Sequence, residues 1–548
     1  MTKKLAEDSS PILPVSSRTN DVFLRVAAVL DSPEVPAWAA QVLAGIKTSN
    51  FAELVSVVIG RSVPCQPDPP CQLKSKLFRR YLEWDKSRYP AQPDPLAPVD
   101  LSAELAGVPA VPWTAVSADV VLWFSERPPV GLDKERARFG VWFHPTAEEA
   151  CFWELYNGRP VTSTRLLALQ GAESVPVAIA EQHAATKMGW SININKRVAY
   201  WKASFLILRS LRRVREGVPA PAQSPEENSL QQPDPAAGGA PSNTQVVQFF
   251  TRNAIRSARR HLRYRGQARH WFMAYRTDRA KFISQTEDFH PDGFQVIVAP
   301  QDHFYADPFV LEHGGRNFIF FEEYSYRQGK GVISVLEMDE HGPVGAARRV
   351  LERPYHLSYP FLFAHEGEIY LLPETFATRR VELYRAVSFP ERWELAAVLQ
   401  EGLAAADTTL WIENGVFYFF TSIAEKGASE NNFLHLFCAD SLTGPWHPHP
   451  ENPLKDDVRS SRGAGKLFRR RGTLIRPAQD CSVRYGYACQ LNEVKVLSPE
   501  RYWEAPLSRI EPDWMPGLIG THTINSNDWI EVIDGQIYKK LRAGNSLP

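Results

Sequence analysis

A hairpin unit of about 50 residues recurs along the C-terminal half of this 548-residue sequence. Each copy is an apolar run, a glycine turn and a second apolar run, and the glycines are Gly315, Gly367, Gly415, Gly472 and Gly535. Glycine suits such turns because tight hairpins need positive φ. Five repeated units predict an all-β, five-bladed propeller over residues 285–545, whose radial closure leaves only short sheet edges. A β-sandwich, the rival fold, does not call for such a repeat.

Residues 216–246 divide the chain into two parts. The segment is rich in Pro, Gly, Ser and Gln and nearly lacks bulky apolar residues, so we predict a flexible linker. Before it, residues 20–215 alternate a helical stretch near 36–49 with apolar runs of strand length, at 22–30, 53–60, 119–125 and 139–143. This alternation predicts an α/β domain with a mainly parallel sheet. No glycine-rich nucleotide motif follows the first run.

Residues 247–283 form a basic segment with apolar residues at helical spacing. Its arginines are Arg252, Arg256, Arg259, Arg260, Arg263, Arg265 and Arg269. We predict a connector helix, and two readings stay open. The helix packs as a solvated connector, or residues 247–275 lie on an anionic membrane surface.

Charge and cysteine content narrow the class of protein. Lys+Arg and Asp+Glu both number 62, so the net charge is zero and we expect no nucleic-acid partner. Six cysteines without a ligand-spaced pair predict reduced thiols and no metal site. The first 20 residues lack the apolar stretch of a signal peptide, and no apolar run approaches transmembrane length. We therefore expect a cytoplasmic protein, with peripheral contact at the inner face of the membrane as the alternative.

Six motifs in the repeat region resemble, in order, the N-terminal domain of plant glucosamine inositolphosphorylceramide transferases. That domain is itself similar to the five-bladed propellers of glycoside hydrolases. The motifs are YADPF (305–309), FFEEY (320–324), HLSYPFLF (356–363), IYLLPE (369–374), AVSFPERWEL (386–395) and GTHTIN (520–525). The resemblance implies a propeller that handles sugars. In the plant enzymes a separate glycosyl-transferring domain follows the propeller, and these 548 residues have no counterpart.

Residues 139–169 resemble the core of formyltransferases, in which a strand ends in an Asn-x-His-x-Ser motif. His144 matches the catalytic His of that family, but Trp142 stands in the place of the Asn, and residues 170–185 hold no Asp to complete the set. The resemblance implies a Rossmann-like, formyltransferase-like domain. With two catalytic groups missing, we expect this domain to position a substrate or bind a partner.

Candidate catalytic residues lie at or after the unit starts. In the hydrolase-like propellers an Asp in an Ala-Asp-Pro context is the general base, which implies that role for Asp307. Inverting cleavage needs a second carboxyl at roughly 6.5–9.5 Å. Its candidates are Glu374, Asp407 and either Glu322 or Glu323, and His522 could replace it as the acid. Equivalent positions of a propeller converge on its axis, so we expect Asp307, Glu374, Asp407 and His522 to share one funnel.

Sugar-binding candidates surround those four residues. Glu322 and Glu323 are adjacent on one strand, so at most one of them faces the funnel. The predicted binding residues are Glu323, Tyr359, Arg476, Gln479 and Asp480.

The sequence as a whole predicts a carbohydrate-active protein, a transferase that modifies or transfers a sugar in the biosynthesis of a cell-surface glycan or glycolipid. The sequence does not name the donor, for which a nucleotide sugar is a candidate. Two alternatives remain. One is a sugar N-formyltransferase that uses N10-formyltetrahydrofolate, and the other is a non-catalytic glycan-binding or scaffold protein.

Overall fold

The structure is a computed structural model that describes residues 23–60, 75–90, 92–125, 136–145, 150–170, 175–217 and 239–540. The chain divides into two compact units, Met1–Ile255 and Arg256–Pro548. Residues 218–238 of the predicted linker lie outside the described residues. Among the helices that are described, none contains a stretch long and apolar enough to cross a membrane.

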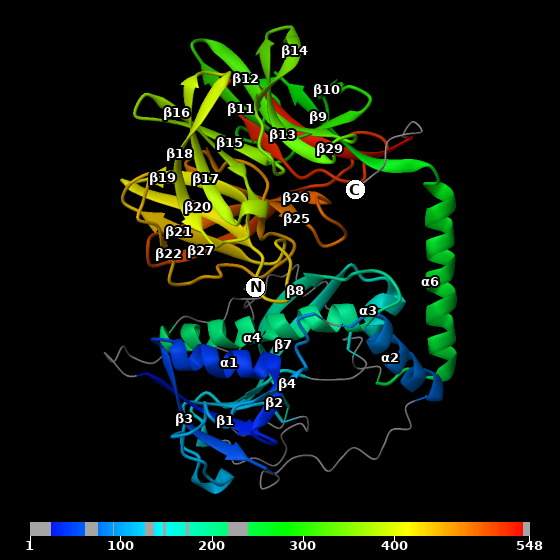
Figure 1. Cartoon of the computed structure of the whole chain (residues 1–548), viewed down its shortest axis with the longest axis vertical. Coiled ribbons are helices and arrows are strands. Elements are labelled where there is room, and N and C mark those ends of the chain that lie inside the picture. Colours follow the sequence, from blue (N-terminus) through cyan, green and yellow to red (C-terminus); the bar gives the residue numbers. More distant parts are fainter. Residues whose placement is uncertain are drawn as a thin grey trace, which may run out of the picture. The chain divides into compact units, whose positions relative to one another are not determined.

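A six-stranded sheet in the order β3-β1-β5-β6-β7-β8 forms the centre of the first unit (Figure 1). Strands β3, β1, β5 and β6 are parallel, and β7 and β8 are antiparallel to their neighbours. The parallel part and its four strands agree with the predicted α/β sheet. The strands are β1 (Leu24–Leu30), β3 (Ala52–Ile59), β5 (Val120–Trp123), β6 (Val141–Phe143), β7 (Val161–Leu169) and β8 (Val177–Ala185).

Helices α1 (Ala37–Thr48) and α4 (Asn193–Arg215) pack against each other, and α4 also covers β7 and β8. Trp38 and Trp201 lie in the core that these helices share with the sheet. The remaining elements are α2 (Lys76–Arg88), α3 (Phe152–Asn157), the 3-10 turn η1 (Trp113–Ala115) and a small sheet of β2 (Glu34–Pro36) and β4 (Pro98–Asp100).

The second unit is a five-bladed β-propeller, as the repeat predicts (Figure 1). In the first three blades the chain runs from the innermost to the outermost strand. The first contains β11 (His303–His313), β12 (Arg316–Ser325), β13 (Lys330–Asp339) and β14 (Gly342–Leu351). The second contains β15 (Ser358–His365), β16 (Glu368–Glu374), η5 (Phe376–Thr378), β17 (Arg380–Ser388) and β18 (Arg392–Glu401). The third contains β19 (Ala405–Glu413), β20 (Val416–Ile423), β21 (Leu434–Ala439) and β22 (His447–Pro448).

The last two blades depart from this simple pattern. The fourth blade splits its inner strand into β23 (Arg462–Gly463) and β24 (Phe468–Arg470), followed by β25 (Thr473–Asp480), β26 (Ala488–Leu497) and β27 (Tyr502–Ile510). The fifth blade combines two distant segments. They are β28 (Ile524–Ser526) and β29 (Glu531–Lys540) from one end, and β9 (Gln267–Arg276) and β10 (Gln295–Ile297) from the other.

The fifth blade closes the ring by pairing β29 with β9 along ten residues. The predicted turn at Gly535 is therefore wrong, because Gly535 lies inside β29 and the turn occupies residues 527–530. The propeller also begins at residue 267 instead of 285. A repeat search misses this closure because the fifth unit is not continuous in sequence.

The predicted basic helix is shorter than residues 247–283. Helix α6 covers Asn243–Arg263, and the next residues form β9 and the 3-10 turn η4 (Arg279–Lys281). Gly266, with φ of 71°, marks the change of direction. The sequence of β9, QARHWFMAYR, is buried almost throughout. Burial on both faces suits a strand and not the continuation of an amphipathic helix.

Candidate functional site

Three inner strands carry the same irregularity near their first residues. Asp307, Tyr359 and Asp407 have φ of 50°, 44° and 50°, in the left-handed region, and the pairing register of each strand shifts at that point. Such conformations are uncommon for residues with a side chain and cost of order 1–3 kcal/mol each. The predicted equivalence of these three positions is confirmed. Each bulge re-aims its residue at the end of the propeller where the inner strands begin.

The residues that pair just before each bulge form a second set. In the first three blades, the cross-strand partners of the residues before the bulges are Glu322, Glu374 and Ser422. In the fourth blade, Gln479 pairs with Arg462. In the fifth blade, the backbone N–H of Asp534 donates to the Thr523 oxygen. These five positions come from the second strand of each blade. Propeller symmetry therefore brings five polar side chains beside the bulges at one end of the axis.

Carboxylates connect neighbouring blades at this end. The backbone N–H of Asp307 donates to Asp534 Oδ2 at 3.2 Å, and the N–H of Tyr359 donates to Asp307 Oδ2 at 3.2 Å. The N–H of Asp407 donates to Glu374 Oε2 at 3.3 Å. Each bulge thus presents a backbone donor to an acid of the preceding blade, so these acids help to close the ring.

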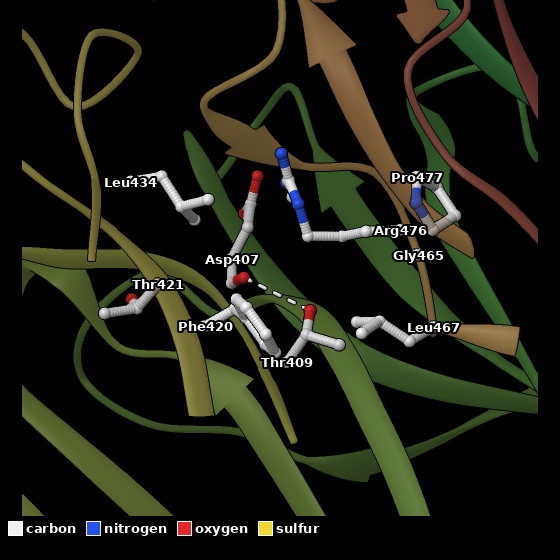
Figure 2. Close-up of a pocket in the computed structure, with 10 residues that line it drawn as sticks. Asp407, Thr409, Phe420, Thr421, Leu434, Gly465, Leu467, Arg476 and Pro477 are labelled. Atoms are coloured by element: carbon white, nitrogen blue, oxygen red, sulfur yellow. Dashed lines mark hydrogen bonds between the residues drawn. The ribbon is translucent and has the colours of Figure 1, made fainter. Parts of the chain in front are cut away.

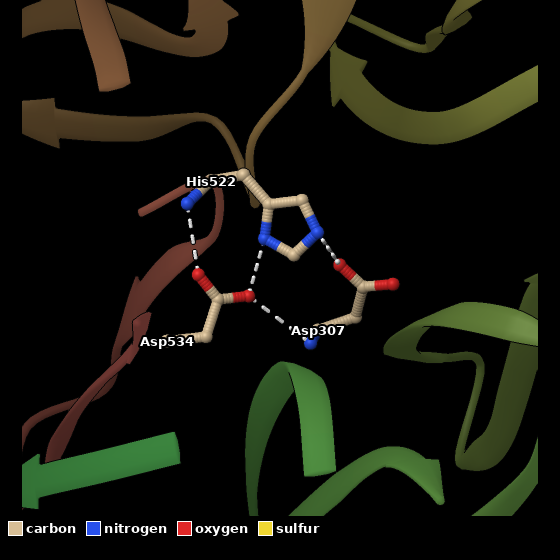
Figure 3. A group of neighbouring side chains, drawn as sticks. All are labelled: Asp307, His522 and Asp534. Atoms are coloured by element: carbon tan, nitrogen blue, oxygen red, sulfur yellow. Dashed lines mark hydrogen bonds and ion pairs between the residues drawn. The ribbon is translucent and has the colours of Figure 1, made fainter. Parts of the chain in front are cut away.

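His522 lies between two of these carboxylates (Figure 3). Its Nδ1 is 2.5 Å from Asp534 Oδ2, and its Nε2 is 3.5 Å from Asp307 Oδ1. Trp271 stacks on the imidazole with ring centroids 3.9 Å apart. Nδ1 therefore faces Asp534 and Nε2 faces Asp307, so each imidazole nitrogen lies beside a carboxyl group. The three side chains are also close enough together to ligate a cation. Asp534 accepts the backbone N–H of His522 at 2.8 Å as well.

Arg462 binds two further acids of the site. Its Nε donates to Asp407 Oδ2 at 2.6 Å, and its Nη2 donates to Glu374 Oε2 at 3.0 Å. Gln479 adds a bond from Nε2 to Asp407 Oδ2 at 2.7 Å. The Tyr485 ring lies 4.9 Å from the guanidinium and edge-on to His522, and is 36% exposed. Tyr485 therefore forms part of the rim of the site.

Glu322 has a different environment. The backbone N–H of Gly331 donates to Nδ1 of His356 at 3.0 Å, so His356 carries its proton on Nε2, 3.4 Å from Glu322 Oε1. A Cβ on Gly331 would lie 2.7 Å from the same carboxyl oxygen, so this close approach requires glycine. The half-exposed His356 connects the buried Glu322 with solvent.

Burial changes the protonation of this cluster. It raises the pKa of Asp307 to about 6, although the nearby His522 opposes the change. It also raises the pKa values of Glu322 and Glu374 well above their usual range, against the pull of Arg462 on Glu374. Burial lowers the pKa of His522, but Asp534 and Asp307 outweigh it and the net change is upward. The site therefore holds protons near neutral pH and can both donate and accept them.

The four predicted catalytic residues, Asp307, Glu374, Asp407 and His522, thus lie together, as do the predicted Tyr359 and Gln479. Tyr359 is buried and its hydroxyl accepts the N–H of Gly465 at 2.8 Å. Their roles in catalysis and binding remain predictions.

Three predicted binding residues lie elsewhere. Glu323 accepts a bond from Ser334 at 2.6 Å on the opposite face of β12 from Glu322, because side chains alternate along a strand. The guanidinium of Arg476 is bound by Glu504 at 2.6 and 2.7 Å, and Asp480 pairs with Arg509 at 3.0 Å. These buried charges are already satisfied by partners within the fourth blade.

A small pocket lies beside Asp407, between the third and fourth blades (Figure 2). It is lined mainly by small and apolar groups, among them Thr409, Phe420, Leu467 and Pro477. The Thr409 hydroxyl donates to the backbone oxygen of Asp407 at 3.4 Å. The predicted residue Arg476 also lines this pocket, which adjoins the acidic cluster through Asp407. Asp307 and His522 do not line it.

Sequence reasoning missed Asp534, Arg462 and Tyr485. Asp534 could have been found from its place on the second strand of the fifth unit, equivalent to Glu322 and Glu374. Arg462 lies in a short, glycine-rich strand without a repeat signal.

In the first unit, His144 and Trp142 are both used in packing. Trp142 is buried and its indole N–H donates to the Phe139 oxygen at 2.8 Å. Nδ1 of His144 donates to the Arg165 oxygen at 3.1 Å, and burial lowers the pKa of His144 to about 4. The formyltransferase resemblance of this unit stays a prediction, and Trp142 stands where the family motif has an amide.

Comparisons with known proteins identify relatives of the propeller. Residues 296–536 match the family described as the N-terminal region of glucosamine inositolphosphorylceramide transferase 1. The Oryza sativa subsp. japonica protein of that name is 33% identical over 247 residues, which cover 42% of this chain and 33% of the relative. The Arabidopsis thaliana protein is 32% identical over 250 residues, which cover 42% and 32%. The chain therefore spans about a third of the length of these curated relatives.

Solved structures with detectable similarity include glycoside hydrolases. The family 117 glycoside hydrolase Zg3597 from Zobellia galactanivorans is 12% identical, with a TM-score of 0.30 and coverage of 43% of this chain and 85% of that chain. An exo-beta-1,3-galactanase from Phanerochaete chrysosporium is 15% identical, with a TM-score of 0.27 and coverage of 39% and 51%.

Proposed function

We propose that this chain is a carbohydrate-active protein, and that the axial site of its propeller holds a sugar of a glycolipid or cell-surface glycan during sugar transfer. The convergence of acids from four blades with His522 is the observation that carries the proposal. Two features support a sugar as the ligand. Carboxylates and imidazole supply acceptors and donors for hydroxyl groups, and Tyr485 offers an aromatic face at the rim.

The relatives suggest the class of substrate. Their printed name joins glucosamine to an inositolphosphorylceramide, so we propose a glycolipid with a sugar or inositol headgroup and a nucleotide sugar as donor. In this proposal Asp307 is the base that takes a proton from an attacking hydroxyl, with His522 accepting that proton in turn. The attacking oxygen bonds to the anomeric carbon of the donor while the bond from that carbon to the phosphate oxygen breaks, and the protonated Glu322 gives its proton to the departing phosphate. Arg462 positions Asp407 and Glu374.

A non-catalytic glycan-binding protein is the second candidate. One observation favours it, because Arg462 already neutralises two of the four predicted catalytic residues. Binding without turnover by the intact chain would select this candidate.

The test compares two adjacent residues on opposite faces of β12. Full-length protein is titrated with glucosamine, an inositol phosphate headgroup and UDP-sugars, and binding is followed by calorimetry or ligand-observed NMR. Glu322→Gln should weaken binding roughly tenfold to a hundredfold, the cost of leaving a buried hydroxyl of the ligand without its carboxyl hydrogen-bond partner. Glu323→Gln is the matched control and should bind like the unaltered chain. Equal affinities for both variants, or no binding of any sugar, would refute the proposal.

A further inference from the structure

Helix α6 is one long, continuous helix (Figure 1). Its residue spacing places two parallel stripes of side chains on its exposed surface. Val247, Ile255, Ala258 and Leu262 form an apolar stripe, and next to it lie the arginines at positions 252, 256, 259 and 263. Residues three and four apart lie on one face of a helix, so each set forms a line. Val247 and Ile255 are each 51% exposed and Leu262 is 72% exposed.

The opposite side of α6 supplies its contacts with the first unit. Val246 and Phe249 are buried in a cluster with Phe78 and Tyr81. Every residue from 254 to 263 is exposed. The two stripes therefore belong to a surface that the hydrophobic cores of the described residues do not use.

The charge of this region is one-sided. Between Asp234 and Asp278 the sequence contains eight arginines and no acidic residue, in a chain whose net charge is zero. Arg276 is neutralised by the buried Glu531, so the other seven arginines give this segment a net positive charge. Arg252 lies over the Tyr156 ring at 4.4 Å, and Arg263 lies 5.4 Å from the ring of the adjacent Tyr264. Arg259, Arg260 and Arg263 are all exposed and are the arginines chosen to test the surface.

We propose that α6 docks on an anionic lipid bilayer, with the apolar stripe inserted at the interface and the arginines on lipid phosphates. An exposed apolar stripe beside a basic stripe is the pattern of a helix lying in the plane of a membrane. A nucleic acid would use the arginines and leave the apolar stripe exposed. Tyr264 stacks on Tyr538 of β29 with centroids 3.6 Å apart, so the helix end is fastened to the propeller. The proposal does not depend on the sugar site.

Vesicle flotation of the full-length chain tests the proposal. Vesicles of phosphatidylcholine alone are compared with vesicles that also contain phosphatidylglycerol, at low and at high salt. We expect binding to the anionic vesicles at low salt only, because salt shortens the range of the attraction from ~10 Å at 0.1 M to ~3 Å at 1 M. The triple variant R259Q/R260Q/R263Q should reduce the partition coefficient on the order of a hundredfold, since each arginine near the surface contributes a factor of about five.

Matched controls separate the charge and the apolar contributions. R327Q/R348Q/R392Q removes the same charge from exposed positions on the propeller and should bind normally. Leu262→Ser should weaken binding several-fold, whereas Leu395→Ser, at an exposed position on β18, should not.

Three outcomes would overturn the proposal. The first is no binding to anionic vesicles at low salt, and the second is equal loss of binding in both triple variants. The third is binding that Leu262→Ser leaves unchanged and that soluble polyphosphate abolishes, which would assign the surface to a soluble polyanion.

Discussion

Replacing Asp307 with Asn should make the propeller more stable at neutral pH while impairing its site. Folding raises the pKa of Asp307 from 3.8 to about 6, chiefly through burial. The folded state therefore binds more protons than the unfolded state between these values, and stability falls as the pH rises through this window. At about 1.36 kcal/mol per pH unit, a change of about two units corresponds to about 3 kcal/mol.

The amide can replace most of the hydrogen bonds of the acid. The Asn oxygen can accept the N–H of Tyr359, and its NH₂ can donate to the Thr523 hydroxyl, which now donates to Asp307 at 2.9 Å. Below about pH 4, where the carboxyl is protonated in both states, the two proteins should be similarly stable. Above about pH 6, Asp307→Asn should be more stable by about 3 kcal/mol.

Urea unfolding of both full-length proteins across this pH range measures the difference. The variant Phe309→Leu, a change in the propeller core, identifies which unfolding transition belongs to the propeller, because it should shift that transition. Other titrating groups are common to both proteins, so they largely cancel. A difference that does not change with pH, or that turns against the variant as the pH rises, would refute the argument. Sugar binding should weaken in the same variant, because the amide lacks the charge and the basicity of the carboxylate. A gain in stability with a loss of binding is the trade-off expected of a functional residue.

Three further changes test other parts of the structure. Arg276 of β9 and Glu531 of β29 form a buried ion pair between the two strands that close the ring, with Arg276 Nε 2.8 Å from Glu531 Oε1. Arg276→Met leaves Glu531 without this partner and should lower the free energy of unfolding in urea by about 3–5 kcal/mol. A loss below about 1 kcal/mol would contradict a role of this pair in ring closure. Gly331→Ala forces a Cβ against Glu322 and should cost about 1–3 kcal/mol, so unchanged stability would contradict it. With Trp142 in place of Asn, incubation with N10-formyltetrahydrofolate and amino-sugar nucleotides should give no formylated product by mass spectrometry, and detectable product would contradict this.

The propeller was predictable because its first three blades repeat in sequence. Glycine turns and apolar runs recur in register, so Asp307, Tyr359 and Asp407 could be recognised as equivalent before any coordinates were known. The fifth blade was not predictable in the same way, since its pairing of β29 with β9 joins segments about 260 residues apart and depends on the ring as a whole. Arg462 was missed for a related reason, because its meaning comes from acids of two other blades.

Some acids of the site have a structural role that explains their presence, and one of them does not. Asp307, Glu374 and Asp534 each accept a backbone N–H from the next blade, so ring closure gives each of them a structural use. Glu322 has no such bond among the contacts of the described residues, and its side chain lies 3.4 Å from His356. A buried carboxyl without a strong partner lowers stability, and Gln or Leu would serve packing equally well. Glu322 is therefore the residue at which a functional requirement separates most clearly from a structural one, and loss of sugar binding on Glu322→Gln carries more weight than the same loss at Asp307.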